Sequence, residues 1–357
     1  MNQRIKSTLF LLGRPISPLY SLVMRSRAYF YSKNLFTTHE LDVPVISIGN
    51  LTMGGTGKTP LVIHLAEFLA QMGFKPAIVS RGYHGSAKKR VNIVSDGKKL
   101  LMDARSAGDE PILIATRVPS IVVATGKKRI FPCLEVVERF HCDVIILDDG
   151  FQHLSLSRNL DLVLFGVDHF AGNSRVFPGG DLREPVSALH RCDAFLLTGI
   201  TPTNKDRTQK CTELLQDRFP DKEVFTISAT YSNWVKHTIS SDGISREFIG
   251  VSELPDNLFG FCGIGQPNRF FDMIKQQSIS IVGRRSFADH HAYSPGDISA
   301  LFTLAEKADA RGFLTTEKDV IKLGAKHHSP LPFYTPVLDI ETNDKFKRMV
   351  LDRVTKI

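Results

Sequence analysis

From about residue 41 onward, short apolar runs alternate with longer segments that repeat apolar residues at helical spacing. The apolar runs are expected to be strands at residues 43–48, 75–80, 120–124, 143–147, 162–165 and 194–197. The helical patterns cover residues 60–72, 129–140 and 204–219. Strands that are apolar throughout and alternate with helices are typical of a parallel sheet covered on both faces. We therefore predict an α/β domain over residues 40–225.

The pattern changes near residue 223, where polar and apolar residues begin to alternate. Residues 225–231 and 235–240 are expected to be antiparallel strands of a hairpin, with a turn at 241–243. Further apolar runs follow at 258–262, 279–282 and 312–315, and helical patterns lie at 267–277 and 295–310. We predict that the hairpin connects the first domain to a smaller α/β domain, the two together covering residues 226–357.

Residues 1–39 form a third region, which is apolar and carries no Asp or Glu. Its six basic residues supply +6 of the net charge of +8, so the remainder carries only about +2. The charge is therefore not that of a nucleic-acid groove spread over the fold. Arg14 and Pro15 interrupt the apolar run, whereas a spanning helix needs about 20 apolar residues. We predict a helix lying in a membrane interface, with a core-packed helix of basic outer face as the alternative.

Overall composition and cysteine usage exclude several classes of protein. The chain is 42% hydrophobic and 23% charged, which is ordinary for a globular protein and argues against disorder. Its five cysteines are dispersed and form no C-x-x-C pair. That pattern favours neither a disulfide framework nor a zinc ribbon, and it fits a reducing cytoplasm.

The strongest chemical signal is the glycine-rich segment that ends in Lys58 and Thr59. It follows an expected strand and opens an expected helix, which is the context of a phosphate-binding P-loop. The residues expected to bind ATP are Thr52, Met53, Gly54, Gly55, Thr56, Gly57, Lys58 and Thr59. Lys58 is expected to contact the β- and γ-phosphates, and the Thr59 hydroxyl to hold Mg²⁺. Thr52 stands where the strict pattern has glycine, and the alternative is a glycine-rich turn followed by a chance Lys-Thr.

A second signal is the acidic pair Asp148-Asp149, which ends the apolar run at 143–147. In P-loop proteins a carboxylate at the end of a central strand serves Mg²⁺, often through water. Two adjacent carboxylates beside a triphosphate are costly unless a cation neutralises them. The alternative is a solvent-facing strand end, and which of the two residues contacts the metal stays open.

Two weaker motifs carry groups suited to acid–base chemistry. Asp109 precedes Glu110 and Pro111, so it is either a helix N-cap or a carboxylate beside an attacking hydroxyl. Asp289, His290 and His291 form a cluster in the predicted second domain. No Glu or Cys completes a metal-ligand set there, and a histidine pair is more often structural.

Taken in order, these motifs resemble the tetraacyldisaccharide 4'-kinase family of the lipid A pathway. The resemblance extends from the N-terminal apolar segment to about Leu323 and rests on the series G-N-L-T-x-G-G-T-G-K-T, S-R-G-Y, G-D-E-P, D-D-G-F-Q-H, F-P-G-G-D-L-R-E-P, F-C-G-I-x-x-P-x-x-F, F-x-D-H-H-x-Y and T-T-E-K-D. Thr52 is normal for this family.

The resemblance implies transfer of the γ-phosphate of ATP to the 4'-hydroxyl of a tetraacylated glucosamine disaccharide 1-phosphate, giving lipid IVA. It implies that Asp109 is the base, that His290 tunes it from the second domain, and that Asp148 and Asp149 serve Mg²⁺. Further residues at family site positions are Arg129, Gln152 and Glu184, and Arg81 is expected to contact an anionic ligand. Lys127 and Lys128 flank Arg129 and are candidates to share its role.

A lipid acceptor and ATP together place the expected reaction at the cytoplasmic face of the bacterial inner membrane, with residues 1–39 as the surface contact. No nucleic-acid partner and no obligate protein partner is expected. The main alternative is a P-loop switch or metallochaperone ATPase that acts on a protein partner. A nucleotide-binding membrane scaffold is disfavoured, because Lys58 and both carboxylates are present.

Overall fold

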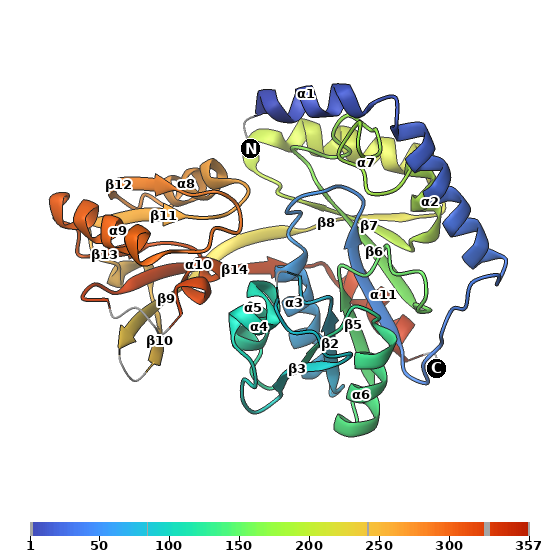
Figure 1. Ribbon diagram of the computed structural model, residues 1–357, viewed down its shortest axis with the longest axis horizontal. Coiled ribbons are helices and arrows are strands. Elements are labelled where there is room, and N and C mark those ends of the chain that lie inside the picture. Colours follow the sequence, from blue (N-terminus) through green and yellow to red (C-terminus); the bar gives the residue numbers. More distant parts are fainter. Residues whose placement is uncertain (1–2, 84, 241–242, 325–328, 356–357) are drawn as a thin grey trace. The chain divides into compact units, whose positions relative to one another are not determined.

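The computed structural model describes residues 3–83, 85–240, 243–324 and 329–355 (Figure 1). The chain divides into two compact units. Unit 1 comprises Met1–Ala229 and Ile340–Ile357, and unit 2 comprises Thr230–Asp339.

Within the described residues, unit 1 is built on an eight-stranded sheet of order β3-β4-β2-β5-β1-β6-β7-β8. The strands are β1 (Val45–Asn50), β2 (Pro76–Ser80), β3 (Asn92–Asp96), β4 (Val122–Thr125), β5 (Val144–Asp148), β6 (Leu160–Gly166), β7 (Ala194–Thr198) and β8 (Glu223–Thr226). All pairings are parallel except that between the edge strand β3 and β4. The mostly parallel sheet expected from the sequence is confirmed.

Helices pack against this sheet through separate apolar clusters. The described helices of unit 1 that follow β1 are α3 (Lys58–Gln71), α4 (Ala104–Ala107), α5 (Asp109–Arg117), α6 (Ile130–Phe140), α7 (Lys205–Arg218) and α11 (Asp344–Val354). Val136 of α6 lies in one cluster with Ile145 and Leu147. Leu215 of α7 lies in another with Phe195. Strands whose side chains are buried on successive positions have no solvent-facing side, which explains their apolar runs.

The order of the strands brings the two strongest sequence motifs together. β1 lies between β5 and β6, and Ile48 is aligned with Asp148 in the parallel β1–β5 pair. The loop after β1 and the acidic pair after β5 therefore leave the sheet at neighbouring positions on the same edge. Crevices at the carboxyl ends of strands are where open α/β sheets bind ligands.

Unit 2 contains a six-stranded sheet of order β10-β9-β14-β13-β11-β12 among its described residues. Its strands are β9 (Ser228–Ser240), β10 (Gly243–Ile249), β11 (Leu258–Cys262), β12 (Ile281–Ser286), β13 (Gly312–Leu314) and β14 (Phe333–Glu341). Its helices are α8 (Pro267–Gln276), α9 (Pro295–Lys307) and α10 (Glu317–Leu323), and 3₁₀ turns lie at Val251–Glu253 here and at Val186–Arg191 and Pro202–Asn204 in unit 1.

A hairpin is present, but both of its strands were placed wrongly from the sequence. Residues 225–231 and 235–240 were expected to be its two strands, whereas Glu223–Thr226 is the edge strand of the first sheet and Ser228–Ser240 is the single strand β9, whose hairpin partner is β10. β9 and β10 pair antiparallel. The expected turn residues 241 and 242 lie outside the described residues. Alternation alone does not tell to which sheet a strand belongs, since either sheet offers a half-buried edge.

The C-terminal segment, expected to belong to the second domain, instead packs in unit 1. Helix α11 buries Phe346, whose ring meets that of Phe225 with centroids 5.3 Å apart. Lys345 forms an ion pair with Glu223 at 2.7 Å, and Arg353 with Asp193 at 3.2 Å. β14 thus carries the chain from unit 2 back to unit 1.

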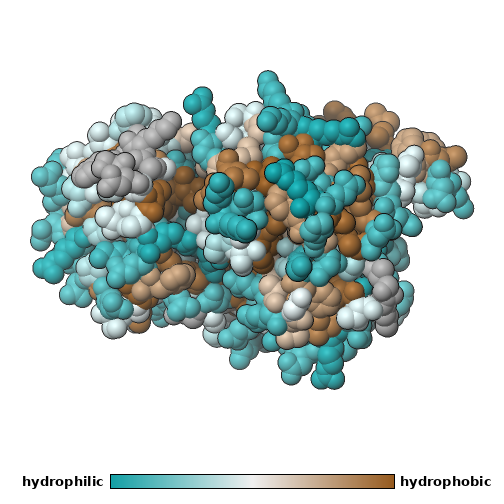
Figure 2. Space-filling model, turned by 90° about the horizontal axis from the view of Figure 1, so that it is seen from below, coloured by the Kyte–Doolittle hydropathy of each residue, from teal (hydrophilic) through white to brown (hydrophobic). Residues whose placement is uncertain are grey.

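The N-terminal region forms two helices, α1 (Gln3–Gly13) and α2 (Ser17–Ser32). Large apolar side chains on and just after these helices are exposed, among them Leu9, Leu11, Leu12, Ile16, Leu19, Leu22, Val23, Tyr29, Leu35 and Phe36. Hydrophobic residues also reach the surface on the face shown in Figure 2, where they lie among hydrophilic ones. No helix in the described part of the chain combines the length and hydrophobicity needed to cross a bilayer.

A buried histidine in unit 2 predicts a pH dependence of stability. His237 is 4% exposed, and its Nε2 lies 2.9 Å from Thr335 Oγ1. Burial, helped by the charge of Arg246, lowers its pKa to about 3. An unfolded histidine titrates near 6.5, so between pH 6.5 and 3 the unfolded chain binds a proton that the folded chain does not. We expect this residue to cost about 2 kcal/mol of stability between pH 7 and pH 5.

Denaturant unfolding of the wild type and of His237→Gln at both pH values measures this cost. The glutamine keeps a group able to hydrogen-bond Thr335 but cannot titrate, so its stability should fall less on acidification. Other histidines contribute equally to both proteins. Equal losses in the two proteins would contradict the prediction.

Candidate functional site

The loop between β1 and α3 has the backbone shape of a phosphate-binding turn. Gly54 and Gly57 have φ of 129° and 83°, a region that residues with a Cβ rarely adopt. The Asn50 side chain donates hydrogen bonds to the carbonyl oxygens of Thr52 at 2.8 Å and Gly54 at 3.3 Å. Because Asn50 ends the buried strand β1, it ties the loop to the sheet. Thr59, in the first turn of α3, is buried.

Two other segments support this loop from outside its own sequence. Thr198, at the end of β7, donates its hydroxyl to Thr56 O at 2.8 Å. Met53 N donates to Asp181 O at 2.8 Å, and Arg183 N donates to Leu51 O at 2.8 Å. The P-loop is therefore held by hydrogen bonds from the end of β7 and from residues 181–183.

Asp149 meets two cations at the centre of the site. Its carboxylate lies 3.2 Å from Lys58 Nζ and 2.7 Å from Arg183 Nη1. Lys58 Nζ also donates to Asn50 Oδ1 at 3.0 Å. Burial raises the pKa of Asp149, but the charges of Lys58 and Arg183 outweigh it and hold the pKa below its usual value. Asp149 has φ of 54°, which turns its side chain away from the line of β5.

Asp148 and Thr59 supply the oxygen donors that Mg²⁺ prefers. Asp148 is 4% exposed at the end of β5, and Thr59 is 7% exposed at the start of α3. Within the described ranges, no three His, Cys, Asp or Glu side chains converge to hold a metal by themselves. Mg²⁺ commonly binds through one or two carboxylates together with substrate phosphates and water, so this donor set fits it.

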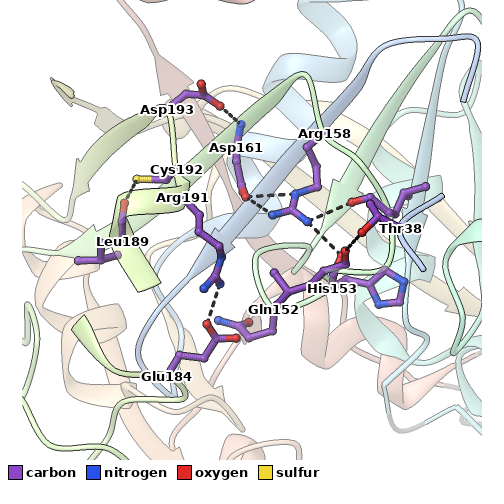
Figure 3. A network of polar contacts seen from close by, with 12 residues as sticks. Thr38, Gln152, His153, Arg158, Asp161, Glu184, Leu189, Arg191, Cys192 and Asp193 are labelled. Carbon is purple, nitrogen blue, oxygen red and sulfur yellow. Dashed lines mark hydrogen bonds and ion pairs between the residues drawn. The ribbon is translucent and has the colours of Figure 1, made fainter. Parts of the chain in front are cut away.

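Gln152 and Glu184 lie beside the P-loop in a network of polar contacts. Gln152 Nε2 donates to Asn50 O at 2.9 Å, and its Oε1 accepts from Arg183 Nη1 at 3.4 Å. Glu184 is buried and accepts from Arg191 Nη2 at 2.6 Å. Figure 3 shows Gln152, Glu184 and Arg191 in one group. The structure thus brings together two residues that the sequence placed in the site only by family resemblance.

Arg129 is a buried cation near the acidic pair. It is 4% exposed, and its Nη1 donates to the carbonyl oxygens of Gly126 and Lys127 at 3.3 and 3.4 Å. Burial lowers the pKa of Arg129, while the charges of Asp148 and Asp149 oppose that shift. Arg129 N donates to His153 Nε2 at 3.3 Å, and burial lowers the pKa of His153 to about 4, so this acceptor nitrogen is unprotonated at neutral pH.

Three exposed cations, Arg81, Lys127 and Lys128, accompany Arg129. The charge of Arg81 acts on both Arg129 and His153, although Arg81 itself is exposed. Lys127 and Lys128 are exposed as well. The region therefore carries exposed positive charge that can attract an anionic ligand.

Asp109 is the first residue of α5 and is 8% exposed. It follows Gly108, whose φ of 97° turns the chain sharply, and its Oδ1 accepts from Glu110 N at 3.1 Å. A Cβ at Gly108 would lie 2.4 Å from Tyr83 O, so that turn packs against the chain after β2. A carboxylate at a helix start is stabilised in its charged form.

In unit 2, the two histidines of the cluster have different surroundings. His291 Nε2 lies 3.1 Å from Asp297 Oδ2, and the His291 ring stacks on Phe287 with centroids 4.7 Å apart. His290 has φ of 56° and lies 3.9 Å from Asp289 Oδ1. His291 is thus part of the packing at the start of α9.

Sequence reasoning missed several residues that build this site. Arg183 entered only as part of the motif F-P-G-G-D-L-R-E-P, and Asn50, Thr198 and Arg27 were not singled out. Arg27 Nη2 donates to Gln152 O at 3.0 Å from helix α2. Asn50 could have been found, because a polar residue at the buried end of an apolar strand requires a partner.

Comparisons with known proteins agree with each other. A family model described as tetraacyldisaccharide-1-P 4'-kinase matches residues 9–355. The tetraacyldisaccharide 4'-kinase of Desulfotalea psychrophila is 42% identical over 346 residues, covering 97% of this chain and 97% of the relative. That of Geobacter sulfurreducens is 38% identical, covering 91% of this chain and 88% of the relative. The solved structure of "apo" form LpxK from Aquifex aeolicus in complex with ATP matches with a TM-score of 0.75 and 29% identity, covering 98% and 99% of the two chains.

Proposed function

The chain belongs to the tetraacyldisaccharide-1-P 4'-kinase family, and from that premise we propose which residues carry the reaction. The protein is an ATP-dependent kinase that phosphorylates the 4'-position of tetraacyldisaccharide 1-phosphate in lipid A synthesis. The observation that carries the residue assignment is the meeting of the P-loop and Asp148-Asp149 at neighbouring strand ends.

We assign ATP binding to the loop from Thr52 to Thr59. Its backbone N–H groups and the N-terminus of α3 face anionic phosphates favourably. Lys58, now shared between Asp149 and Asn50, would exchange Asp149 for the β- and γ-phosphates. Arg183 would remain on Asp149, so that this carboxylate keeps a counter-charge while Lys58 moves.

We assign Mg²⁺ to the oxygens of Thr59, Asp148 and Asp149. A bound Mg²⁺ would neutralise charge between the β- and γ-phosphates. Asp148 ends β5 next to the P-loop strand β1, and Asp149 meets Lys58 and Arg183, so both carboxylates are assigned to the ion.

We assign the proton transfer to Asp109. The 4'-oxygen of the acceptor would attack the γ-phosphorus, its proton would pass to the Asp109 carboxylate, and ADP would leave with the electrons of the broken P–O bond. From the family resemblance alone, His290 is assigned the tuning of this base. Arg81, Arg129, Gln152 and Glu184 are assigned to the lining of the site, with the arginines facing anionic groups.

A transfer assay tests these roles together. Purified protein would be incubated with γ-labelled ATP and tetraacyldisaccharide 1-phosphate in mixed detergent micelles. Label should enter the lipid and should require both substrates. Hydrolysis of ATP without labelling of the lipid would instead favour the switch ATPase, which acts on a protein partner.

We further propose that helices α1 and α2 contact the cytoplasmic face of the inner membrane. The support is the row of exposed apolar side chains on a segment without acidic residues. Such helices bind at the interface through their apolar side chains, while Arg and Lys meet anionic head groups.

This contact predicts a loss of vesicle binding in the double variant Leu19→Glu/Leu22→Glu. Both leucines are exposed on α2. Burying a leucine side chain contributes about 1.5–3 kcal/mol, so partial insertion of two predicts at least about tenfold weaker binding. Co-sedimentation with vesicles containing anionic lipid measures it. The matched control is Met72→Glu/Leu214→Glu, which changes exposed apolar residues outside the N-terminal helices. Equal binding by both variants would refute the assignment.

A further inference from the structure

Helix α2 makes buried polar contacts that a surface anchor does not require. Ser17, the first residue of α2, is 6% exposed. Its hydroxyl donates to Val176 O at 2.9 Å and accepts from Gly179 N at 2.7 Å. A Cβ at Gly179 would lie 2.3 Å from Ser17 Oγ, and one at Gly13 would lie 2.3 Å from Pro178 O. The turn between α1 and α2 therefore packs backbone against backbone on the 176–184 loop.

The same loop contacts the phosphate site on its other side. Met53 N donates to Asp181 O, and Arg183 N donates to Leu51 O, both at 2.8 Å. The Arg183 side chain holds both carboxylate oxygens of Asp149 at 2.7 and 2.9 Å. The 176–184 loop thus lies in hydrogen-bonded contact with both α2 and the P-loop.

Arg27, further along α2, provides a second connection to the site. Its Nη2 donates to Gln152 O at 3.0 Å, and its Nη1 lies 3.8 Å from the buried Glu184. Gln152 in turn donates to Asn50 O, at the residue that holds the P-loop backbone. Between these two connections, the Tyr20 hydroxyl donates to Arg183 O at 3.1 Å.

We propose that Ser17 and Arg27 are positioning residues of the nucleotide site, so that docking of α2 on the 176–184 loop and Gln152 sets the affinity for ATP. The inference uses the kinase activity and does not depend on the proposed membrane contact. Leu19, Leu22 and Val23 of α2 are exposed. Its polar groups Ser17, Tyr20 and Arg27 instead have partners in the 176–184 loop and at Gln152. A buried polar group is costly unless it is paired, which makes docking specific.

Nucleotide binding in detergent, without lipid acceptor, tests this proposal. The variants are Ser17→Ala and Arg27→Ala, and the probe is ATP with Mg²⁺, followed by calorimetry. Losing a hydrogen bond of this kind is expected to weaken ATP binding about tenfold in each variant. In the transfer assay, KM for ATP should rise more than kcat falls.

Matched controls separate positioning from general damage. Ser32→Ala removes an exposed serine of α2 whose hydroxyl bonds its own helix at Tyr29 O, and Arg25→Ala removes the same charge from the same helix. Both should bind ATP as the wild type does. Arg27→Lys keeps a charge near Glu184 but reaches fewer acceptors, so its affinity should lie between those of the wild type and Arg27→Ala.

The outcomes are distinct. Wild-type ATP affinity in folded Ser17→Ala and Arg27→Ala would overturn the proposal, whatever their melting temperatures. If Arg27→Ala does not fold, Arg27→Lys decides alone: about threefold weaker binding supports the proposal, and unchanged binding overturns it. Failure of the kinase assignment itself would show differently, as a wild type that binds ATP but transfers no phosphate to lipid.

Discussion

Asp109→Asn is expected to lower phosphate transfer about 10²-fold or more while ATP binding stays near that of the wild type. The asparagine has nearly the same shape and keeps an oxygen for Glu110 N, so the start of α5 should be preserved. It cannot accept the proton of the attacking hydroxyl. Single-turnover transfer in mixed micelles, measured alongside ATP binding, separates chemistry from nucleotide affinity.

Asp103→Asn is the matched control for that result. Asp103 caps α4 through a hydrogen bond from Ser106 N at 2.9 Å, six residues before Asp109, and asparagine caps equally well. Its transfer rate should be unchanged. A wild-type rate in Asp109→Asn would reduce Asp109 to a residue of the helix start.

The same assay tests whether His290 acts through Asp109. If His290 tunes the base, His290→Gln should slow transfer in the wild-type background and add little once Asp109 is already asparagine. If the rate losses of the two single variants multiply in the double variant, the two residues act independently.

Lys58→Ala is expected to lower kcat/KM by about 10²–10³-fold, because it removes a fixed positive charge from the transferred phosphate. The loss also leaves Asp149 with Arg183 as its remaining counter-charge in the P-loop network. Unlike Asp109→Asn, this variant should bind ATP more weakly. Titration with ATP and the transfer assay together measure both effects.

Lys75→Ala provides the control for Lys58. Lys75 is an exposed lysine just before β2. It therefore lies at the N-terminal end of that strand, whereas the P-loop and the acidic pair lie at the carboxyl ends of their strands. Its removal lowers the net charge equally, so a similar loss in both variants would mean that overall charge and not the P-loop contact is responsible. We expect only Lys58→Ala to lose activity.

Much of the fold could be predicted because strands of a parallel sheet are apolar along their whole length. The expected runs at 143–147 and 194–197 match β5 and β7 within a residue. The edge strand β3 was not predicted because half-exposed residues interrupt its burial. The returning strand β14 was not predicted because Thr335 and Pro336 interrupt the apolar run of its buried first half. Edge strands lack the continuous apolar signal of central ones.

Within the site, contiguous motifs were the predictable part. The P-loop from Thr52 to Thr59 and the pair Asp148-Asp149 are local segments whose chemistry follows from residues next to each other in the chain. The counter-ion of Asp149 was not predictable, because Arg183 lies 34 residues away and nothing in its own neighbourhood reveals the partner.

The N-terminal region shows the same limit of prediction from local sequence. Its charge, its apolar character and its insufficient length for a membrane span were evident from residues 1–39. That Ser17 and Arg27 reach loops 159 and 125 residues further along the chain was not.

The sequence by itself determined the α/β class, the phosphate-binding loop and the acidic pair, since periodicity and loop chemistry are local properties of the chain. Only the tertiary structure decided that residues 340–357 return to unit 1, that Arg183 and Lys58 share Asp149, and that α2 touches the nucleotide site. These depend on which distant segments the sheet order brings together, and a hydrogen bond or ion pair across more than 30 residues leaves no pattern in either partner's own sequence.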